Sequence, residues 1–298
     1  MKKNNTNKPK FSIIIPTYSA EMLLIECIQS LCNQSVEKNS FEVIVVNDGG
    51  KREISKKIEL FDNQLEIRYF YQENKGPAAA RNLGINKARG DIILFLDDDS
   101  LPTSVWLKAV INAWETYPDY DGIGGYIRSD KTDSIYCRVN TDFFNWYLAN
   151  YSVNEHYPFL TTCNAGYKKR TLNKVGNFDE AFRKASGEDR DLNIKLINAG
   201  GKLRLDKTVL VYHDRDLTIS SYTKKYYNYG KAAKKIYSRY PELKRLSSNS
   251  YFNLYVSILK NYHTYKEKLM AFLLVTLSQV FTILGYHSAI LSKQELDN

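Results

Sequence analysis

The chain contains little cysteine, and its cysteines show neither the spacing of a zinc site nor that of a disulfide framework. The four cysteines are Cys27, Cys32, Cys137 and Cys163. None of them belongs to a CxxC pair, and the beginning of the chain has Lys2 and Lys3 but no apolar signal-peptide core. We therefore expect a reduced, cytoplasmic protein.

Strand and helix patterns alternate after a polar tail at residues 1–10. The apolar runs typical of buried strands cover residues 11–16, 41–46, 65–71 and 92–96. Ser19 is expected to cap the helix after the first run, and Gly76-Pro77 opens a second helix that Gly90 ends. This alternation predicts an α/β fold with a mostly parallel sheet flanked by helices.

The most informative motif is Asp97-Asp98-Asp99, which directly follows the apolar run Ile92–Leu96. Three carboxylates at the end of one buried strand repel one another unless a cation or ordered donors lie opposite them. Carboxylate oxygens are the usual protein ligands of Mg²⁺ or Mn²⁺ in enzymes that handle nucleotides. The motif predicts a metal-dependent diphosphate site, with a solvated acidic turn as the plain alternative.

Polar residues follow two other predicted strands. Pro16-Thr17-Tyr18 comes after the first run and Asp48 after the second. Ligands bind beyond the carboxyl ends of the strands in parallel α/β sheets. We therefore expect these residues to lie on the same edge as Asp97 to Asp99.

The helix that begins near Gly76 adds candidate anion ligands. Asn74 and Lys75 precede it, and Arg81 and Asn82 lie in its first turns. Free N–H groups and the helix dipole attract anions there, and the forked guanidinium of Arg81 suits a diphosphate or a base edge. The plain alternative for Arg81 is a surface cation.

The ordered set of motifs resembles the family 2 glycosyltransferases, which have the nucleotide-sugar-binding GT-A fold. The matching segments are Ile14–Tyr18, Val45–Gly49, Asn74–Asn82, Leu94–Asp99 and Gly187–Leu192. They extend in order over about residues 11–214. The resemblance implies a GT-A domain at 11–215, followed by a helical C-terminal region at 216–298.

The resemblance also implies roles for the donor-site residues. The nucleotide-sugar-binding residues would be Pro16, Thr17, Tyr18, Asp48, Asn74, Gly76, Arg81, Asp97 and Asp98. Asp48 would accept a hydrogen bond from the base, although Asn47 stands where an acid is more frequent. Asp99 and Asp97, with His213 as a further ligand, would hold Mn²⁺ or Mg²⁺.

The acceptor side is implied by three further segments. Asp189, in the pair Glu188-Asp189, would take the proton from the acceptor hydroxyl, and the attack would invert the anomeric carbon. Asn164 and Ala165 would belong to the sugar or acceptor pocket. Loops such as Tyr126 to Phe159 would shape donor selectivity.

The resulting hypothesis is an inverting, metal-dependent glycosyltransferase of hexosyltransferase type that works in polysaccharide biosynthesis. Its donor would be a nucleotide diphosphate sugar, with a UDP-sugar favoured, and its acceptor would be a glycan or a lipid-linked acceptor. A nucleotidyltransferase is the alternative enzyme, but it would have little use for an acceptor base. A basic nucleic-acid-binding protein is the non-enzymatic alternative, suggested by the net charge of +9. We expect no nucleic acid partner, because carboxylates gather where phosphates would approach.

The C-terminal region leaves two kinds of contact open. Ser221 to Tyr240 interleaves tyrosines with lysines, which suits either a packed amphipathic helix or an anionic membrane surface. Leu269 to Leu291 has no charged residue, but its Ser, Thr, Gln and His residues make it a poor membrane span. We expect a buried or membrane-lying helix, with a location at the inner face of the plasma membrane or a homodimer interface as consequences to test.

Overall fold

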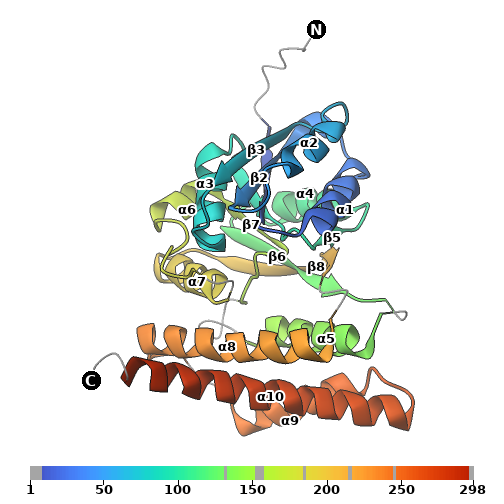
Figure 1. The fold of residues 1–298 in the computed structure, drawn as a ribbon, viewed down its shortest axis with the longest axis vertical. Helices are drawn as coiled ribbons and strands as arrows, with labels where there is room; N and C mark the ends of the chain where they lie inside the picture. The colour runs from blue at the N-terminus through green and yellow to red at the C-terminus, as the bar shows by residue number, and fades with distance from the viewer. Residues whose placement is uncertain are drawn as a thin grey trace. The chain divides into compact units, whose positions relative to one another are not determined.

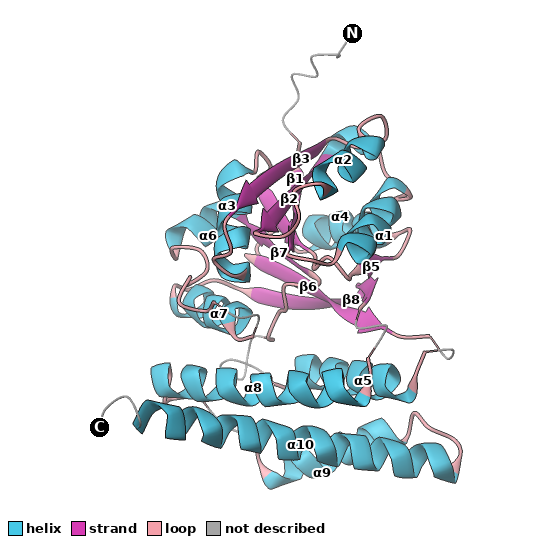
Figure 2. Cartoon of the chain, viewed as in Figure 1, coloured by secondary structure: helices cyan, strands magenta, loops and turns pink. Residues whose placement is uncertain are grey.

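The computed structural model forms two compact units. It describes residues 9–130, 133–151, 158–183, 186–213, 217–243 and 246–294. The first unit comprises residues 1–126 and 160–211, and the second comprises 127–159 and 212–298. The first unit is an α/β sheet structure and the second is helical, as the ribbons of Figures 1 and 2 show.

An eight-stranded sheet organises the first unit. Its strands are β1 Phe11–Thr17, β2 Phe41–Asp48, β3 Ile67–Gln72, β4 Ile92–Phe95, β5 Leu101–Pro102, β6 Gly122–Arg128, β7 Ala165–Lys168 and β8 Leu203–Tyr212. Their order across the sheet is β3-β2-β1-β4-β7-β6-β8-β5. The sheet is mixed, because one half of it is parallel and β7 reverses direction.

The parallel half contains the four strands that the apolar runs predict. β1 lies between β2 and β4 and is parallel to both, and β2 is also parallel to β3. Every residue of β2 is buried, as expected for a strand that is covered on both faces. The carboxyl ends of β1, β2 and β4 therefore reach the same edge of the sheet, which confirms the predicted parallel pairing in this half.

β7 is antiparallel to both of its neighbours, β4 and β6. The pairing sets Leu94 opposite Gly166 and Phe95 opposite Ala165. β7 has only four residues and is distant from β4 in the sequence. So short a strand has no detectable periodicity, and the pattern along the chain did not predict it.

The helices of the first unit cover the sheet. They are α1 Glu21–Cys32, α2 Ile54–Ile58, α3 Pro77–Lys87, α4 Trp106–Thr116, α6 Lys169–Lys174 and α7 Glu188–Asn198. α3 begins with Pro77 in its first turn, as predicted, and Gly76 before it has a φ of 94°. The predicted cap of α1 is wrong, because the N-cap is Ala20 and no side chain caps this helix.

The second unit contains four helices within the described residues. They are α5 Ile135–Asn150, α8 Ile219–Arg239, α9 Ser248–Leu259 and α10 Tyr265–Gln294. The segment that we expected to be looped, Tyr126 to Phe159, therefore holds a sixteen-residue helix, which Ser134 caps by accepting from the Cys137 amide.

The core of this unit is aromatic. Tyr222 and Tyr226 of α8 are buried with Val139, Trp146 and Leu254 from two other helices. The tyrosines of α8 thus serve helix packing on one face, which agrees with the amphipathic-helix interpretation of this segment.

Candidate active site

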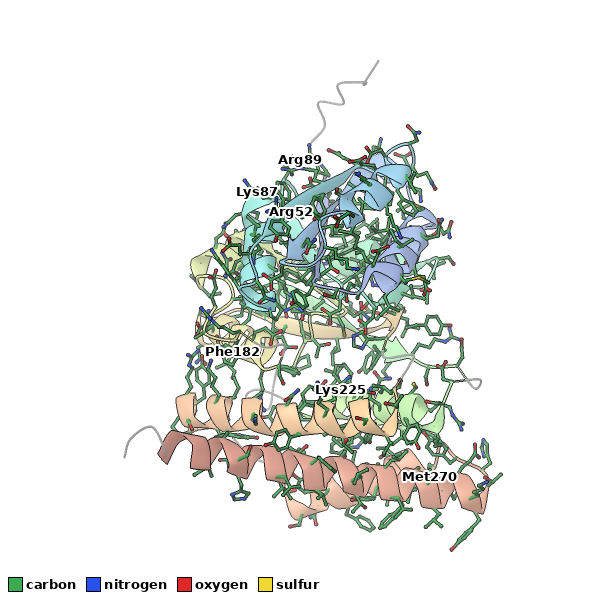
Figure 3. All side chains as sticks on the ribbon, in the orientation of Figure 1. Arg52, Lys87, Arg89, Phe182, Lys225 and Met270 are labelled. Carbon is green, nitrogen blue, oxygen red and sulfur yellow. The ribbon has the colours of Figure 1, made fainter. Side chains whose placement is uncertain are left out.

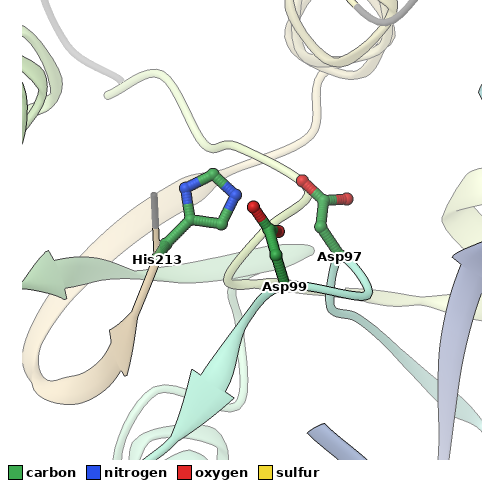
Figure 4. Close-up of side chains that lie close together, drawn as sticks. All are labelled: Asp97, Asp99 and His213. Carbon is green, nitrogen blue, oxygen red and sulfur yellow. The ribbon is translucent and has the colours of Figure 1, made fainter. Parts of the chain in front are cut away.

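Asp97 and Asp99 lie in the turn after β4, where the sequence places them. One carboxylate oxygen of each and one ring nitrogen of His213, the residue directly after β8, all lie within 4.8 Å of one another. The three side chains point toward one another (Figure 4). This separation is short enough for a single cation to contact all three.

The end of β1 meets the same turn. The Thr17 hydroxyl donates a hydrogen bond of 2.7 Å to Oδ2 of Asp98. Tyr18, the next residue, is 54% exposed, so its ring is available to a ligand. The loop after β2 passes close by, because a Cβ at Gly50 would lie only 1.6 Å from the Tyr18 carbonyl oxygen. A residue larger than glycine would therefore push this loop away from Tyr18.

Asp48, at the end of β2, organises the start of α3. Its two carboxylate oxygens accept hydrogen bonds from the backbone amides of Lys75 at 2.9 Å and Gly76 at 2.8 Å, and from the Gln72 side chain. Asn74 is exposed in the same loop. The loop that would receive a nucleotide is thus held in place by Asp48, while a direct contact of Asp48 with a base remains a prediction.

Arg81 connects the acidic turn after β4 with the acidic start of α7. It is buried on α3, and its guanidinium donates from Nη2 to Asp97 at 2.8 Å and from Nη1 to Glu188 at 2.8 Å. The pKa of Arg81 is raised despite burial, because Asp97 and Glu188 lie beside it. The side chain therefore stays charged and holds both carboxylates in fixed orientations.

Glu188 and Asp189 begin α7, after Gly187 in a left-handed conformation with a φ of 93°. Both oxygens of Glu188 are engaged: Oε1 accepts from Arg81, and Oε2 accepts from the Ser186 amide at 2.8 Å. Glu188 is buried. Its contacts are those of a fixed counter-ion, which makes its neighbour the better candidate for proton transfer.

The environment of Asp189 raises its pKa to about 7. Burial of the carboxylate is the main cause, and the nearby Glu188 adds to it, while Arg81 and the Arg190 amide oppose the shift. A carboxylate with a pKa near neutrality is well matched to the work of a general base.

The predicted pocket residues Asn164 and Ala165 lie at the start of β7. Asn164 is buried and donates to the carbonyls of Tyr126 and Val209, each at 3.0 Å, while it accepts from the Trp106 indole at 2.9 Å. Ala165 is paired with Phe95. These contacts tie strands together, and a role of either residue in a sugar pocket remains a prediction.

Sequence reasoning missed what holds the segment before α7. Asn82 of α3 donates to the Phe178 carbonyl and accepts from the Phe178 amide, both at 3.0 Å. A Cβ at Gly76 would lie 2.4 Å from the Arg183 carbonyl oxygen. α3 thus positions the chain that leads into Glu188. In the sequence, only Asn82 and Gly76 could have indicated these contacts.

The side chains around Asp99 fit a divalent cation of the manganese or magnesium type. Carboxylate oxygens suit both ions, and the imidazole of His213 is accepted more readily by Mn²⁺. The clustering of Asp97, Asp99 and His213 supports the expected ligand set.

The family model described as glycosyl transferase family 2 matches residues 12–188. The hyaluronan synthase of Pasteurella multocida is 28% identical over 235 residues, which cover 68% of this chain and 24% of that protein. The chain therefore spans about a quarter of the length of this relative.

Two solved structures are similar in fold. A mannosyltransferase of Pyrobaculum calidifontis, in complex with GDP-Man and Mn²⁺, has a TM-score of 0.64 and 16% identity, over 98% of this chain and 89% of that one. TarS 1-349 of S. aureus, in complex with UDP, has a TM-score of 0.56 and 18% identity, over 96% and 91%. The order of motifs, the sheet and the family match lead to one conclusion: this chain belongs to glycosyl transferase family 2.

Proposed function

We propose that this family 2 glycosyltransferase is an inverting, metal-dependent hexosyltransferase that uses a nucleotide diphosphate sugar, with a UDP-sugar favoured. The observation that carries the proposal is the arrangement around Arg81. Its guanidinium joins Asp97, one of the three clustered metal-ligand candidates, to Glu188, the neighbour of Asp189. A donor-side acid and an acceptor-side acid are thereby held by one side chain.

Asp97, Asp99 and His213 would hold the cation, and Mn²⁺ suits this set best. When bound, the cation would neutralise the negative charge that grows on the leaving nucleoside diphosphate. The exposed ring of Tyr18 and the loop held by Asp48 would flank the base.

Asp189 would act as the general base. Its carboxylate would take the proton from the acceptor hydroxyl while the hydroxyl oxygen attacks the anomeric carbon from the face opposite the diphosphate, which inverts that carbon. Glu188 would fix Arg81 and keep the pKa of Asp189 high. The C–O bond to the diphosphate breaks as the new glycosidic bond forms, so no covalent enzyme intermediate is needed.

The relatives support the type of substrate. The similar hyaluronan synthase is a polysaccharide synthase by its name, and the similar solved structures contain GDP-Man or UDP. We therefore propose a glycan or lipid-linked acceptor at the cytoplasmic face of the membrane.

Calorimetric titration of the purified chain with UDP and GDP, with and without Mn²⁺, tests the donor site. We expect one nucleotide to bind in a Mn²⁺-dependent manner, and Asp99→Ala to abolish this dependence. Asp119→Ala, which removes an exposed aspartate elsewhere in the same unit, is the matched control. Nucleotide binding that ignores Mn²⁺ in the unaltered chain would contradict the metal assignment.

A further inference from the structure

The helical unit has a large exposed apolar surface on α9 and α10. We call it the apolar face. Its exposed side chains are Phe252, Tyr265, Leu269, Phe272, Leu273, Val280, Ile283 and Leu284. On α10 they are spaced by three, four or seven residues, which are the spacings of one helix face, so they form one stripe along the helix. Phe272 also contacts Tyr255 of α9, with ring centroids 5.2 Å apart, which makes the surface continuous between the two helices.

The opposite side of α10 is fully engaged with protein. A Cβ at Gly285 would lie 1.9 Å from the Tyr227 carbonyl oxygen of α8, and a Cβ at Gly230 of α8 would lie 2.0 Å from the Thr282 carbonyl oxygen. Near the other end of α10, the Tyr222 hydroxyl donates to the Leu274 carbonyl at 3.0 Å. α8 and α10 therefore touch along much of their length (Figure 1).

By length and composition, the part of α10 from Tyr265 to Ile290 could cross a bilayer, yet only 28% of its most apolar window is buried in protein. A crossing would draw α8 into the hydrocarbon with it. α8 carries Lys224, Lys225, Lys231, Lys234, Lys235 and Arg239. Lys234 lies 5.7 Å from the ring centroid of Tyr286, beside the second half of α10. Lysines are costly in the bilayer centre, so the contact with α8 argues against a crossing.

The charge around the apolar face identifies the partner. From Ser247 to Ile290 the sequence has three lysines, Lys260, Lys266 and Lys268, and one acid, Glu267. That acid is already paired with Arg138 of α5 at 3.1 Å. Lys260, Lys266 and Lys268 are exposed. Tyr265 and Met270 of α10, the second labelled in Figure 3, are exposed as well. Exposed lysines and aromatic rings around an apolar stripe are the pattern of a helix that lies in the interface of an anionic bilayer.

We propose that the apolar face is a membrane-docking surface, on which α10 lies parallel to an anionic lipid bilayer with its stripe in the interface. This inference gives the proposed membrane location a defined surface. It does not depend on sugar transfer, because vesicle binding and nucleotide binding are measured separately.

Co-sedimentation of the full chain with vesicles tests the proposal. The vesicles are phosphatidylcholine alone, or phosphatidylcholine with about one third anionic phosphatidylglycerol. We expect binding to the anionic vesicles, weaker binding to the neutral ones, and a decrease of binding with salt. Failure of the unaltered chain to bind anionic vesicles at low salt would overturn the proposal.

Paired substitutions locate the surface. Leu273→Ser with Ile283→Ser is expected to lower the partition coefficient about ten-fold or more, because both side chains would leave the interface. Met22→Ser with Leu60→Ser changes two apolar residues of the other unit that are even more exposed, and it should leave binding unchanged. Equal vesicle binding by both double variants would overturn the assignment of the face.

A second pair tests the charge without touching helix packing. Lys266→Gln with Lys268→Gln should reduce the preference for anionic vesicles by about ten-fold or more, since each lysine near the surface contributes roughly five-fold. Lys202→Gln with Lys207→Gln, on exposed lysines of the sheet unit, is the control. UDP binding should be the same in all four double variants. A failure of the proposed function would appear in UDP binding, whereas a failure of the membrane proposal would appear in vesicle binding.

Two further outcomes would overturn the proposal in favour of another occupant or geometry. The first outcome is that the unaltered chain sediments as a dimer without lipid and does not bind vesicles, while Leu273→Ser with Ile283→Ser sediments as a monomer. This outcome would assign the face to a second copy of the chain. Leu269→Trp and Leu284→Trp report depth through quenching by brominated lipids. Equal shallow depths are expected, and clearly different depths would indicate a crossing helix.

Discussion

Arg81 and Glu188 form a buried ion pair of 2.8 Å between α3 and α7, and the second nitrogen of the same guanidinium reaches Asp97 at the end of β4. The arginine was expected near a diphosphate because it stands at a helix N-terminus. In the structure its donors are directed to protein carboxylates. We therefore consider Arg81 to be a positioning residue for both acids.

We expect Arg81→Lys to lower turnover about 100-fold, since one ammonium cannot replace the two-armed contact and a displacement of about 1 Å is enough for such a loss. The rate of sugar transfer and the affinity for UDP with Mn²⁺ are measured together. Arg204→Lys removes a stacked arginine that contacts Tyr117 outside the acidic cluster, and it should retain turnover. Full turnover of Arg81→Lys would exclude the positioning role.

Asp189→Asn should lower transfer by about 10²–10⁴-fold, the range for the loss of a general base. UDP binding in the presence of Mn²⁺ should persist, because Asp189 is not among the clustered metal-ligand candidates. Single-turnover transfer and calorimetry distinguish these two effects. Glu188→Gln is the informative companion, since it should also disturb Arg81. Normal transfer by Asp189→Asn would assign the base to another group.

The pH dependence of the rate follows from the same carboxylate. The pKa of Asp189 is raised to about 7, chiefly by burial and then by Glu188. A general base works when it is deprotonated, so kcat/KM should rise with pH through the neutral range and level off above it. A rate profile from acidic to mildly alkaline pH measures this rise. A profile that is flat through neutrality would contradict the assignment.

Glu42 provides a test of stability away from the acidic cluster. Its side chain is buried, and although burial raises its pKa, hydrogen bonds from Ser12, the Arg89 amide and Arg68 lower it overall. Arg89 is labelled in Figure 3. Because the folded-state pKa lies below the unfolded one, the stabilisation is present above the unfolded pKa and is lost as pH falls through the folded pKa.

Glu42→Gln should therefore destabilise the sheet unit by about 2 kcal/mol near neutral pH, because the buried side chain loses the charge that strengthens its hydrogen bonds from the partly exposed Arg68 and Arg89. Urea unfolding at neutral and acidic pH measures the difference, which should shrink toward acidic pH. Glu59→Gln, on an exposed residue of the same unit, is the control. A constant difference at all pH values would show that the charge of Glu42 does not contribute.

Sequence reasoning predicted the parallel half of the fold well, because β1, β2 and β4 are uninterrupted apolar runs that end in turn or polar residues. It also predicted that Thr17, Asp48 and Asp97 lie at one edge of the sheet, because the carboxyl ends of parallel strands lie at the same edge. The geometric convergence of Thr17 with Asp98 and of Asp97 with Asp99 and His213 agrees with that expectation.

Other features depend on tertiary contacts that no local pattern contains. An arginine is usually a surface residue, and only the three-dimensional neighbourhood shows that Arg81 lies between two acids. Likewise, the helix α5 has a weak pattern of its own and is buried by packing with α8, α9 and α10. Ser19 is a residue type that often caps helices, but α1 begins one residue later than predicted, so that Ala20 is at the N-cap position.

The shared use of Arg81 bears on how such enzymes can be recombined. The ion pair joins residues 107 positions apart in the sequence. A chimera with a junction anywhere between α3 and α7 would combine the arginine of one parent with the glutamate of the other. Exchanges of specificity in this protein should therefore transfer α3, the turn after β4 and the start of α7 as a single module.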